Sequence, residues 1–299
     1  MRPSGMPGGR RREGRTGPVA VASAGTLAGY RHASVVAVSN QPDPPSTYYR
    51  QLDSGRYLST EQAQGAWSGD EQHMAPVSAL LTHALDTCSP RTDLVLSRVA
   101  FDILGRIPAG EVAVTAKVLR PGRTIELVEA EMTAGSRTVV RATAWRLALS
   151  DTATVAATDL SPIAGPEAAE RFDMSAIWPG GFIRSVEARA LGERAPGRST
   201  VWLRSRVGIV DGVPTSEQAG LIGLIDTANG VAVRAQPGDV LFPNTDLTVH
   251  LFRRPTGVWL GLETEVSFGP DGLGLTSAVL HDLAGPFGRS AQTLTVRLR

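Results

Sequence analysis

Residues 103–112 read ILGRIPAGEV and residues 250–259 read HLFRRPTGVW, and the two stretches share Leu, Arg, Pro and Gly at four of ten positions. The second stretch begins 147 positions after the first. Each leaves a β-rich run, crosses a Pro-x-Gly turn and enters another β-rich run. Four matches in ten can arise by chance in strands beside turns. The order of the surrounding elements must therefore decide whether one structural unit occurs twice.

Composition narrows the class of protein. The 299 residues are 42% apolar and 20% charged, which suits a globular chain of one or two domains. The 32 Gly and 20 Pro, together with Thr- and Val-rich runs, favour sheet over a helical bundle. Residues 1–40 carry six Arg and one acid, so the rest of the chain has a formal charge of about −4. Nothing in that balance indicates nucleic-acid binding.

Cysteine usage and motifs exclude further classes. Cys88 is the only cysteine, so no disulfide can form within the chain, and the cytoplasm is the expected location. No run approaches the roughly 18 apolar residues of a spanning helix, so no integral membrane segment is expected. The sequence has neither a cluster with zinc-ligand spacing nor a phosphate-binding GxxxxGK motif. We therefore expect no metal and no cofactor.

Residues 1–45 differ in character from the rest. Arg10–Arg12 precede a stretch of small apolar residues, which faintly resembles an export signal, but Gly residues and Pro18 interrupt it. We expect a disordered leader over residues 1–45. The alternatives are a cleaved signal or a start site placed too early, with the functional chain beginning near Val38.

The remaining chain divides into two similar segments. In residues 46–150, an apolar helix from about Ala75 to Thr87 ends before Ser89-Pro90, and four β-rich runs separated by turns follow it. Residues 151–174 show no sustained period and are interpreted as a linker.

Residues 175–299 repeat the same order. Two β-rich runs precede the helix in PTSEQAGLIGLIDTANG (214–230), predicted to begin with a Thr215…Gln218 capping box and to end at Asn229-Gly230. Four β-rich runs follow. In such a unit one apolar helix covers the concave face of a curved antiparallel sheet, which is the hotdog fold. The prediction is an α+β double hotdog, with an N-terminal unit at 46–150 and a C-terminal unit at 175–299.

Two strands of the second unit place polar residues among aliphatic ones. In GRSAQTLTVRLR (288–299), the alternation of a half-buried strand directs Gln292 inward. In NTDLTVHLF (244–252), the same alternation puts Thr245 at the end of the inward set. Both side chains are neutral, and both can position a water molecule.

Asp226 is the third unusual residue. It lies at the margin of the apolar stripe of its helix and close to the C-terminus. There the helix dipole disfavours a carboxylate by roughly 0.3–1 kcal/mol, which would raise its pKa. Residues placed against local preference are candidates for function.

The first unit has other residues at these places. Alignment at the two turns gives Arg98 for Thr245; Ala142, Ala144 or Arg146 for Gln292; and Asp86 or Thr82 for Asp226. We therefore expect one active centre, in the second unit.

Three stretches, LIDTANG, NTDLTVHLFRRP and HDLAGPFGRSAQTLTVR, hold Asp226, Thr245 and Gln292. At these residues the sequence resembles the acyl-CoA thioesterase II family and related thioesterase-like double hotdog proteins, over most of residues 46–299. The resemblance implies that the three catalytic side chains orient a water that hydrolyses an acyl-CoA thioester, a reaction of lipid metabolism. The sequence departs from the family pattern at Gln72–Pro76, where QHMAP replaces a Gly-Gly pair. His73, within this stretch, is a candidate for substrate binding.

Two other functions compete with hydrolysis. The chain could be a non-catalytic acyl-thioester-binding protein of the same fold, or an enoyl thioester hydratase with an Asp and a His as in GDEQH (69–73), although that spacing is too short for the hydratase pattern. Acyl-CoA is the expected partner, Arg253 and Arg254 could contact its phosphates, and the chain could form a homo-oligomer.

Overall fold

The computed structural model describes residues 46–299. The leader expected over residues 1–45 lies outside the described residues. Among the described residues, no helix is long and apolar enough to cross a membrane.

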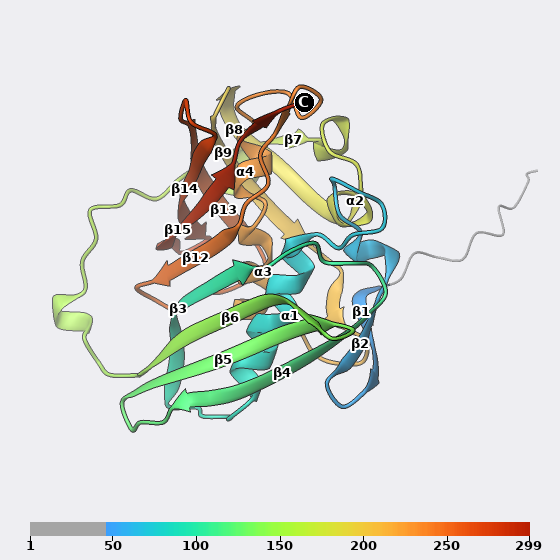
Figure 1. The fold of residues 1–299 in the computed structure, drawn as a ribbon. Helices are drawn as coiled ribbons and strands as arrows, with labels where there is room; N and C mark the ends of the chain where they lie inside the picture. Colours follow the sequence, from blue (N-terminus) through green and yellow to red (C-terminus); the bar gives the residue numbers. More distant parts are fainter. Residues whose placement is uncertain (1–45) are drawn as a thin grey trace, which may run out of the picture. The chain divides into compact units, whose positions relative to one another are not determined.

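The first half folds as a β-hairpin, a helix and four long strands (Figure 1). Helix α1, Met74–Thr87, buries Leu80, Leu81 and Leu85 completely, which is the apolar face that its sequence predicts. A short 3-10 helix, η1 (Glu61–Ala63), precedes it. The strands are β1 (Thr47–Asp53), β2 (Arg56–Ser59), β3 (Leu94–Ile103), β4 (Glu111–Arg120), β5 (Ile125–Ala134) and β6 (Arg137–Ala148).

The second half repeats this order of elements. Its main elements are the hairpin β8 (Val186–Ala195) and β9 (Arg198–Ser205), helix α3 (Glu217–Ile225), and the strands β12 (Asp246–Leu251), β13 (Leu260–Phe268), β14 (Leu273–Asp282) and β15 (Gly285–Thr295). The shorter elements are η4 (Met174–Ala176), α2 (Gly181–Ser185), β10 (Gly208–Val210), α4 (Ala228–Val231), β11 (Val240–Leu241) and β16 (Arg297–Leu298).

The stretch 151–174 between the halves is not entirely irregular. It holds two 3-10 turns, η2 (Ala153–Val155) and η3 (Pro166–Ala168), and the short strand β7 (Glu170–Phe172). β7 pairs antiparallel with β8 at the edge of the sheet. A strand of three residues is too short to show an alternating pattern, which is why the sequence did not reveal it.

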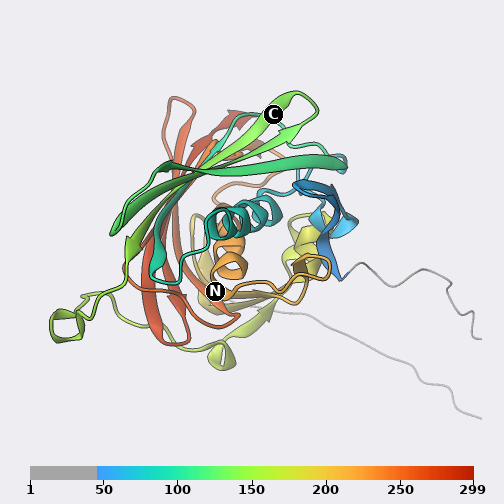
Figure 2. The same cartoon turned by 90° about the horizontal axis from the view of Figure 1, so that it is seen from below.

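The two halves share one sheet, whose order is symmetric about its centre. Fourteen described strands pair in the order β10-β1-β2-β4-β5-β6-β3-β12-β15-β14-β13-β9-β8-β7. From the central β3–β12 pair outward, each half presents the first, fourth, third and second of the four long strands that follow its helix, and then its hairpin. Figure 2 shows α1 and α3 side by side, with the first-half strands on one side and the second-half strands on the other. The predicted α+β double hotdog is confirmed.

The register of β3 against β12 corrects the alignment of the two copies. The buried residues Val99 and Phe101 pair with the buried Val249 and Leu247. Core-facing residues correspond only if the offset is even, and the offset of 148, at which β5 and β14 coincide, matches Val99 with Leu247. The offset of 147 is odd, so it exchanges the faces of the strand. Aligning Thr245 with Arg98 was therefore wrong.

The same register identifies the counterpart of Gln292. Val99 pairs with Ala144 on β6, whereas Gln292 follows Ala291, the partner of Thr248 on β12. Since Val99 corresponds to Leu247, Gln292 corresponds to Ala144, one of the three residues that the sequence left open. The connection from the strand to the proline is one residue shorter in the second half, from Leu251 to Pro255, than in the first, from Ile103 to Pro108, so alignment at the turns hides this relation.

The end points of α3 differ from the prediction. Ser216, not Thr215, caps the helix, because its Oγ accepts the backbone N–H of Ala219 at 3.1 Å. The Thr215 Oγ1 accepts the N–H of Ile209 at 3.1 Å and so joins the helix to β10. The helix ends at Ile225 with Asp226 as its C-cap, and the short α4 follows. The predicted end at Asn229-Gly230 merged two helices.

Helices α1 and α3 approach closely at Gly223. A Cβ added there would lie 2.6 Å from the Cβ of Ala79 and 3.2 Å from the carbonyl oxygen of Ala75. The Ser78 Oγ lies 3.4 Å from the Gly223 carbonyl oxygen. The absence of a side chain at Gly223 thus sets the separation of the two helices.

We predict that Gly223→Ala lowers the free energy of unfolding by about 1–3 kcal/mol, because the new methyl group must push α1 away. Gly220→Ala in the same helix is the matched control: its added Cβ would meet nothing closer than the Thr215 Cγ2 at 3.4 Å. The control should be neutral or stabilise by up to about 1 kcal/mol through helix propensity. Urea unfolding measures both, and equal effects of the two substitutions would contradict the packing argument.

Candidate active site

Asp226 is a buried carboxylate held by two side-chain amides. Its residue is 4% exposed, and it lies at the C-terminal end of α3. The Asn244 Nδ2 and the Gln292 Nε2 donate to the same carboxylate oxygen, Oδ1, at 2.8 and 3.1 Å. Burial raises the pKa of Asp226 to about 6, and the two amide hydrogen bonds limit that rise. A carboxyl group with this pKa can exchange a proton near neutral pH.

Gln292 lies on β15 and faces inward, as the alternation of the strand predicts. It is 1% exposed, and its Nε2 also lies 3.3 Å from the backbone oxygen of Asp226. Its Oε1 accepts no hydrogen bond from any described residue. A buried amide oxygen needs a donor, so this atom is suited to hold a small polar molecule.

Thr245 lies just before β12 and lines the same cavity as Asp226. It is exposed rather than inward-facing, and its Oγ1 makes only a long contact of 3.5 Å with the carbonyl oxygen of Thr293. No hydrogen bond joins it to Asp226 or Gln292 within residues 46–299. The structure therefore brings Asp226 and Gln292 into contact and places Thr245 at the rim of the cavity that Asp226 lines.

His73 is the N-cap residue of α1 and faces the second carboxylate oxygen of Asp226. Its Nδ1 accepts the backbone N–H of Ala75 at 3.1 Å and lies 3.5 Å from the Asp226 Oδ2. Its ring lies 4.3 Å from the ring of Phe182, centroid to centroid. Burial lowers the pKa of His73 to about 3, so the ring is neutral near neutral pH and its contact with Asp226 is no ion pair.

Asn244 is a site residue that the sequence analysis missed. Besides Asp226, its Nδ2 contacts the carbonyl oxygen of Asp246 at 3.2 Å. In the sequence Asn244 precedes a β-rich run, where Asn is a common turn former, so it carried no signal. Only the proximity of β12 to the end of α3 reveals it.

Asp226, Asn244, Thr245 and His73 line a cavity of about 390 Å³, whereas Gln292 contacts Asp226 from outside its lining. Its wall is formed by the start of α1, the segment after β3 and the segment before β12, with Trp67, Ile107 and Pro243 as apolar lining. Carboxylate, amide, hydroxyl and imidazole groups thus meet apolar surface in one cavity, the usual composition of a small-molecule site.

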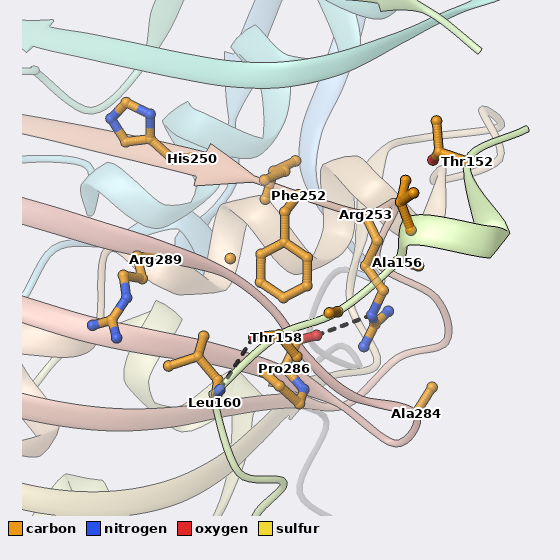
Figure 3. A pocket seen from close by; sticks show the side chains of 14 residues that line it. Thr152, Ala156, Thr158, Leu160, His250, Phe252, Arg253, Ala284, Pro286 and Arg289 are labelled. Atoms are coloured by element: carbon orange, nitrogen blue, oxygen red, sulfur yellow. Dashed lines mark hydrogen bonds between the residues drawn. The ribbon is translucent and has the colours of Figure 1, made fainter. Parts of the chain in front are cut away.

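A larger cavity lies elsewhere and contains none of the predicted site residues. This cavity has a volume of about 910 Å³. Residues from the segment 152–160 line it together with Phe252 and Arg253 (Figure 3). The Arg253 guanidinium donates to both carboxylate oxygens of Asp282 at 2.6 Å. Because the carboxylate of Asp282 neutralises the charge of Arg253, this arginine is a poor partner for a phosphate.

The first half has a different group at the end of its helix. There the Arg146 Nη1 donates to the carbonyl oxygen of Ser89 at 3.0 Å, and its Nη2 pairs with the buried Glu126. Arg146 thus satisfies the C-terminal carbonyls of α1. The counterpart of Gln292 is Ala144, which has no polar group. The polar constellation around Asp226 is therefore not repeated in the first half.

The site consists of protein side chains suited to acid–base chemistry. Among residues 46–299, no group of three or more His, Cys, Asp or Glu side chains is arranged to hold a metal ion. A buried carboxylate, an amide with an unpaired oxygen and a helix N-terminus on a double hotdog define a hotdog-fold protein with a hydrolase-like site.

Comparison with known proteins supplies the family. Residues 63–147 match the acyl-CoA thioesterase N-terminal domain, and residues 153–296 match the acyl-CoA thioesterase C-terminal domain. The chain belongs to the acyl-CoA thioesterase family and is a thioester hydrolase that acts on acyl-CoA. The sequence-based predictions of family, reaction and acyl-CoA substrate are confirmed. No curated protein sequence matches the chain.

Solved structures agree on the fold. The acyl-CoA thioesterase II TesB2 from Mycobacterium marinum has a TM-score of 0.60 and 16% identity, covering 85% of this chain and 96% of that one. The tesB protein of Mycobacterium avium subs paratuberculosis has a TM-score of 0.62 and 17% identity, and the match covers 83% of this chain and 96% of that one. A hot dog fold protein of unknown function from Alicyclobacillus acidocaldarius has a TM-score of 0.67 and 14% identity, and the match covers 83% of this chain and 95% of that one.

The burial of Asp226 predicts a pH-dependent effect on stability. Because its pKa rises from 3.8 to about 6 on folding, the folded protein holds a proton more tightly than the unfolded chain. This residue's contribution to stability therefore falls as pH rises from about 4 to about 6, and then stays constant. Asp226→Asn should stabilise the protein by up to about 3 kcal/mol at pH 7.5 and by much less at pH 4.5.

Urea unfolding of both proteins at the two pH values tests this prediction. A substitution that destabilises the protein equally at both values would mean that the charged carboxylate is better solvated than its burial implies.

Proposed function

We propose that Asp226 is the general base of the hydrolysis and takes a proton from the water that attacks the thioester carbonyl. The observation that carries this proposal is a buried carboxylate with one oxygen occupied by two amide donors and a pKa of about 6. The Asp226 Oδ1 accepts both amides, so Oδ2 is the oxygen that receives the proton. Held in this way, the carboxylate cannot rotate away from the cavity.

Gln292 and Thr245 orient the attacking water. The Gln292 Oε1 lacks a protein donor among the described residues, so it can accept the second hydrogen of the water. The Thr245 hydroxyl, at the rim of the cavity, donates to the water or to the substrate. A water held between the ionised base and this neutral acceptor keeps a lone pair free for the attack.

The carbonyl oxygen becomes negative as the water adds. At the start of α1, the N–H of His73 bonds to Ala63, that of Ala75 bonds to the imidazole, and Pro76 has none. The N–H of Met74 is the one that remains, and Met74 lines the cavity. We assign this N–H to the oxyanion, favoured by the positive end of the helix dipole.

The second step breaks the bond between carbon and sulfur. The tetrahedral intermediate expels the thiolate, which takes the proton held by Asp226 and leaves as free thiol. The products are a carboxylic acid and CoA, the base is restored, and no covalent acyl-enzyme forms.

We place this reaction in lipid metabolism and in the cytoplasm. The single cysteine, Cys88, is half-buried and unpaired, which suits a reducing compartment. Whether the chain forms a homo-oligomer is a separate hypothesis, which the mass of the protein measured in solution tests.

We predict that Asp226→Asn reduces thiol release from a panel of acyl-CoAs by at least about 100-fold, because amides do not accept protons at neutral pH. A thiol-reactive dye follows the release of CoA. Asp86→Asn is the matched control, since Asp86 lies at the corresponding end of α1 and should keep the parental rate. Unchanged turnover in the Asp226 variant would remove it from the mechanism, and tight binding without turnover by the wild type would favour an acyl-thioester binder.

The pH profile gives an independent prediction. Because Asp226 must be ionised, kcat/KM should fall tenfold per pH unit below about 6. Asn244→Ala removes a donor that stabilises the ionised form of Asp226, so the acidic limb of the pH profile should move to higher pH. Asn229→Ala is the control, because Asn229 lines the same cavity without bonding to Asp226. A limb that shifts equally in both variants would refute the assigned role of Asn244.

A further inference from the structure

Four arginines meet at a second pocket, at the edge of the sheet next to α2. Arg171 comes from β7, Arg184 from α2, Arg204 from the end of β9 and Arg206 from the residues after it. They line a pocket of about 420 Å³. None of these residues belongs to the site around Asp226.

Most of the positive charge in this pocket is not neutralised. Glu187 accepts from Arg204 at 2.6 Å and from Arg189 at 2.8 Å, so its charge is already shared between two cations. The other lining acid, Asp173, caps η4 through Ser175. Arg171, Arg184 and Arg206 form no ion pair with any residue in the range 46–299.

Unpaired guanidinium groups around one pocket fit a phosphorylated ligand. The planar guanidinium presents several donors in a fixed geometry that matches phosphate oxygens. Like charges held together without a counter-charge repel one another, and a bound anion removes that repulsion. A ligand with more than one phosphate group matches three such arginines better than a single carboxylate does.

The pocket adjoins an apolar cavity that leads toward the active site. Arg206 lines both the arginine pocket and a cavity of about 230 Å³ between α1 and α3. The hydroxyl of Tyr48 marks their boundary, bonded to Ser185 at 3.0 Å and to Ser205 at 2.7 Å. Phe182 also lines the apolar cavity, and its ring lies 4.3 Å from the ring of His73, beside Asp226, at an interplanar angle of 33°.

The other opening of the active site is less suited to phosphates. At the cavity that Asp226 lines directly, the single cation Arg106 pairs with both Asp70 and Glu71. Asp246 follows Thr245 at the same rim and stands opposite Asp102 on β3. The local surplus of acids would repel a diphosphate.

From this arrangement we propose that Arg171, Arg184 and Arg206 bind the phosphate groups of CoA. This inference rests on the proposed function. The carrier arm then follows the apolar cavity to Asp226, and the acyl group extends into the cavity of about 390 Å³. The route requires the neighbouring side chains of Phe182 and His73 to change conformation when the thioester enters.

The test compares two thioesters of one acyl group in the wild type and in an Arg184→Ala/Arg206→Ala variant. The acyl-CoA carries the phosphates, and the N-acetylcysteamine thioester does not. The variant should raise KM for the acyl-CoA by about tenfold or more, because charge-assisted hydrogen bonds are lost. It should leave kcat/KM for the N-acetylcysteamine thioester unchanged.

An Arg98→Ala/Arg289→Ala variant is the matched control. These two arginines flank His250 on neighbouring strands, and Figure 3 shows Arg289 and His250 beside the larger cavity. This control removes the same charge from another surface and should keep the parental KM for both thioesters. Equal losses for both thioesters in the Arg184/Arg206 variant, or the same KM rise in the control, would overturn the assignment.

A binding measurement separates this inference from the proposed function. Calorimetry with adenosine 3′,5′-bisphosphate should show binding to the wild type at low salt, weaker at high salt and lost in the Arg184/Arg206 variant. If the wild type hydrolyses neither thioester, the proposed function fails, but binding of the bisphosphate still supports the phosphate site. Hydrolysis by the wild type without any binding of the bisphosphate would reject the phosphate site alone.

Discussion

The antiparallel pairing of β3 with β12 is the contact on which the rest of the structure depends. It joins two half-sheets into one, and the joined sheet encloses α1 and α3. Since both strands are central, their backbone N–H and C=O groups are hydrogen-bonded on both sides, and only at the strand ends can such backbone groups remain free. The segment before β12 is such an end, and it brings Asn244 to the C-terminus of α3. The junction that completes the core thus also positions the site.

Polar residues in the core oppose stability, and here their cost is reduced by mutual hydrogen bonding. Asp226 loses solvation on burial, and the amides of Asn244 and Gln292 replace part of it. The first half meets a related problem with an ion pair between Arg146 and Glu126, in which the buried carboxylate is occupied by a guanidinium group. The second half keeps a carboxylate whose ionisation is costly, and this cost is what raises its pKa into a useful range.

The sequence predicted the features that depend on a local period or a local rule. Alternation along the last long strand directed Gln292 inward, and the position of Asp226 near a helix end marked it as unfavourable, both as found. Features that depend on one strand meeting another were not predictable. The connection between the strand and the Pro-x-Gly turn is one residue shorter in the second half, so alignment at the turns set Thr245 against Arg98, from the wrong face. Asn244 looked like a turn residue because its partner, Asp226, is distant in sequence and approaches only through the tertiary fold.

The two halves differ in the side chains that contact the end of each helix. Both helices end against the same sheet, so each end presents carbonyl groups that need donors, and either Arg146 or a set of amides can supply them. The guanidinium of Arg146 is a cation that forms a buried ion pair with Glu126. The amide of Gln292 leaves its oxygen without a protein donor among residues 46–299 and adds no charge. The end of α3 therefore leaves the carboxylate of Asp226 on the wall of a cavity, whereas the carboxylate nearest the end of α1 that Arg146 contacts is paired with a cation.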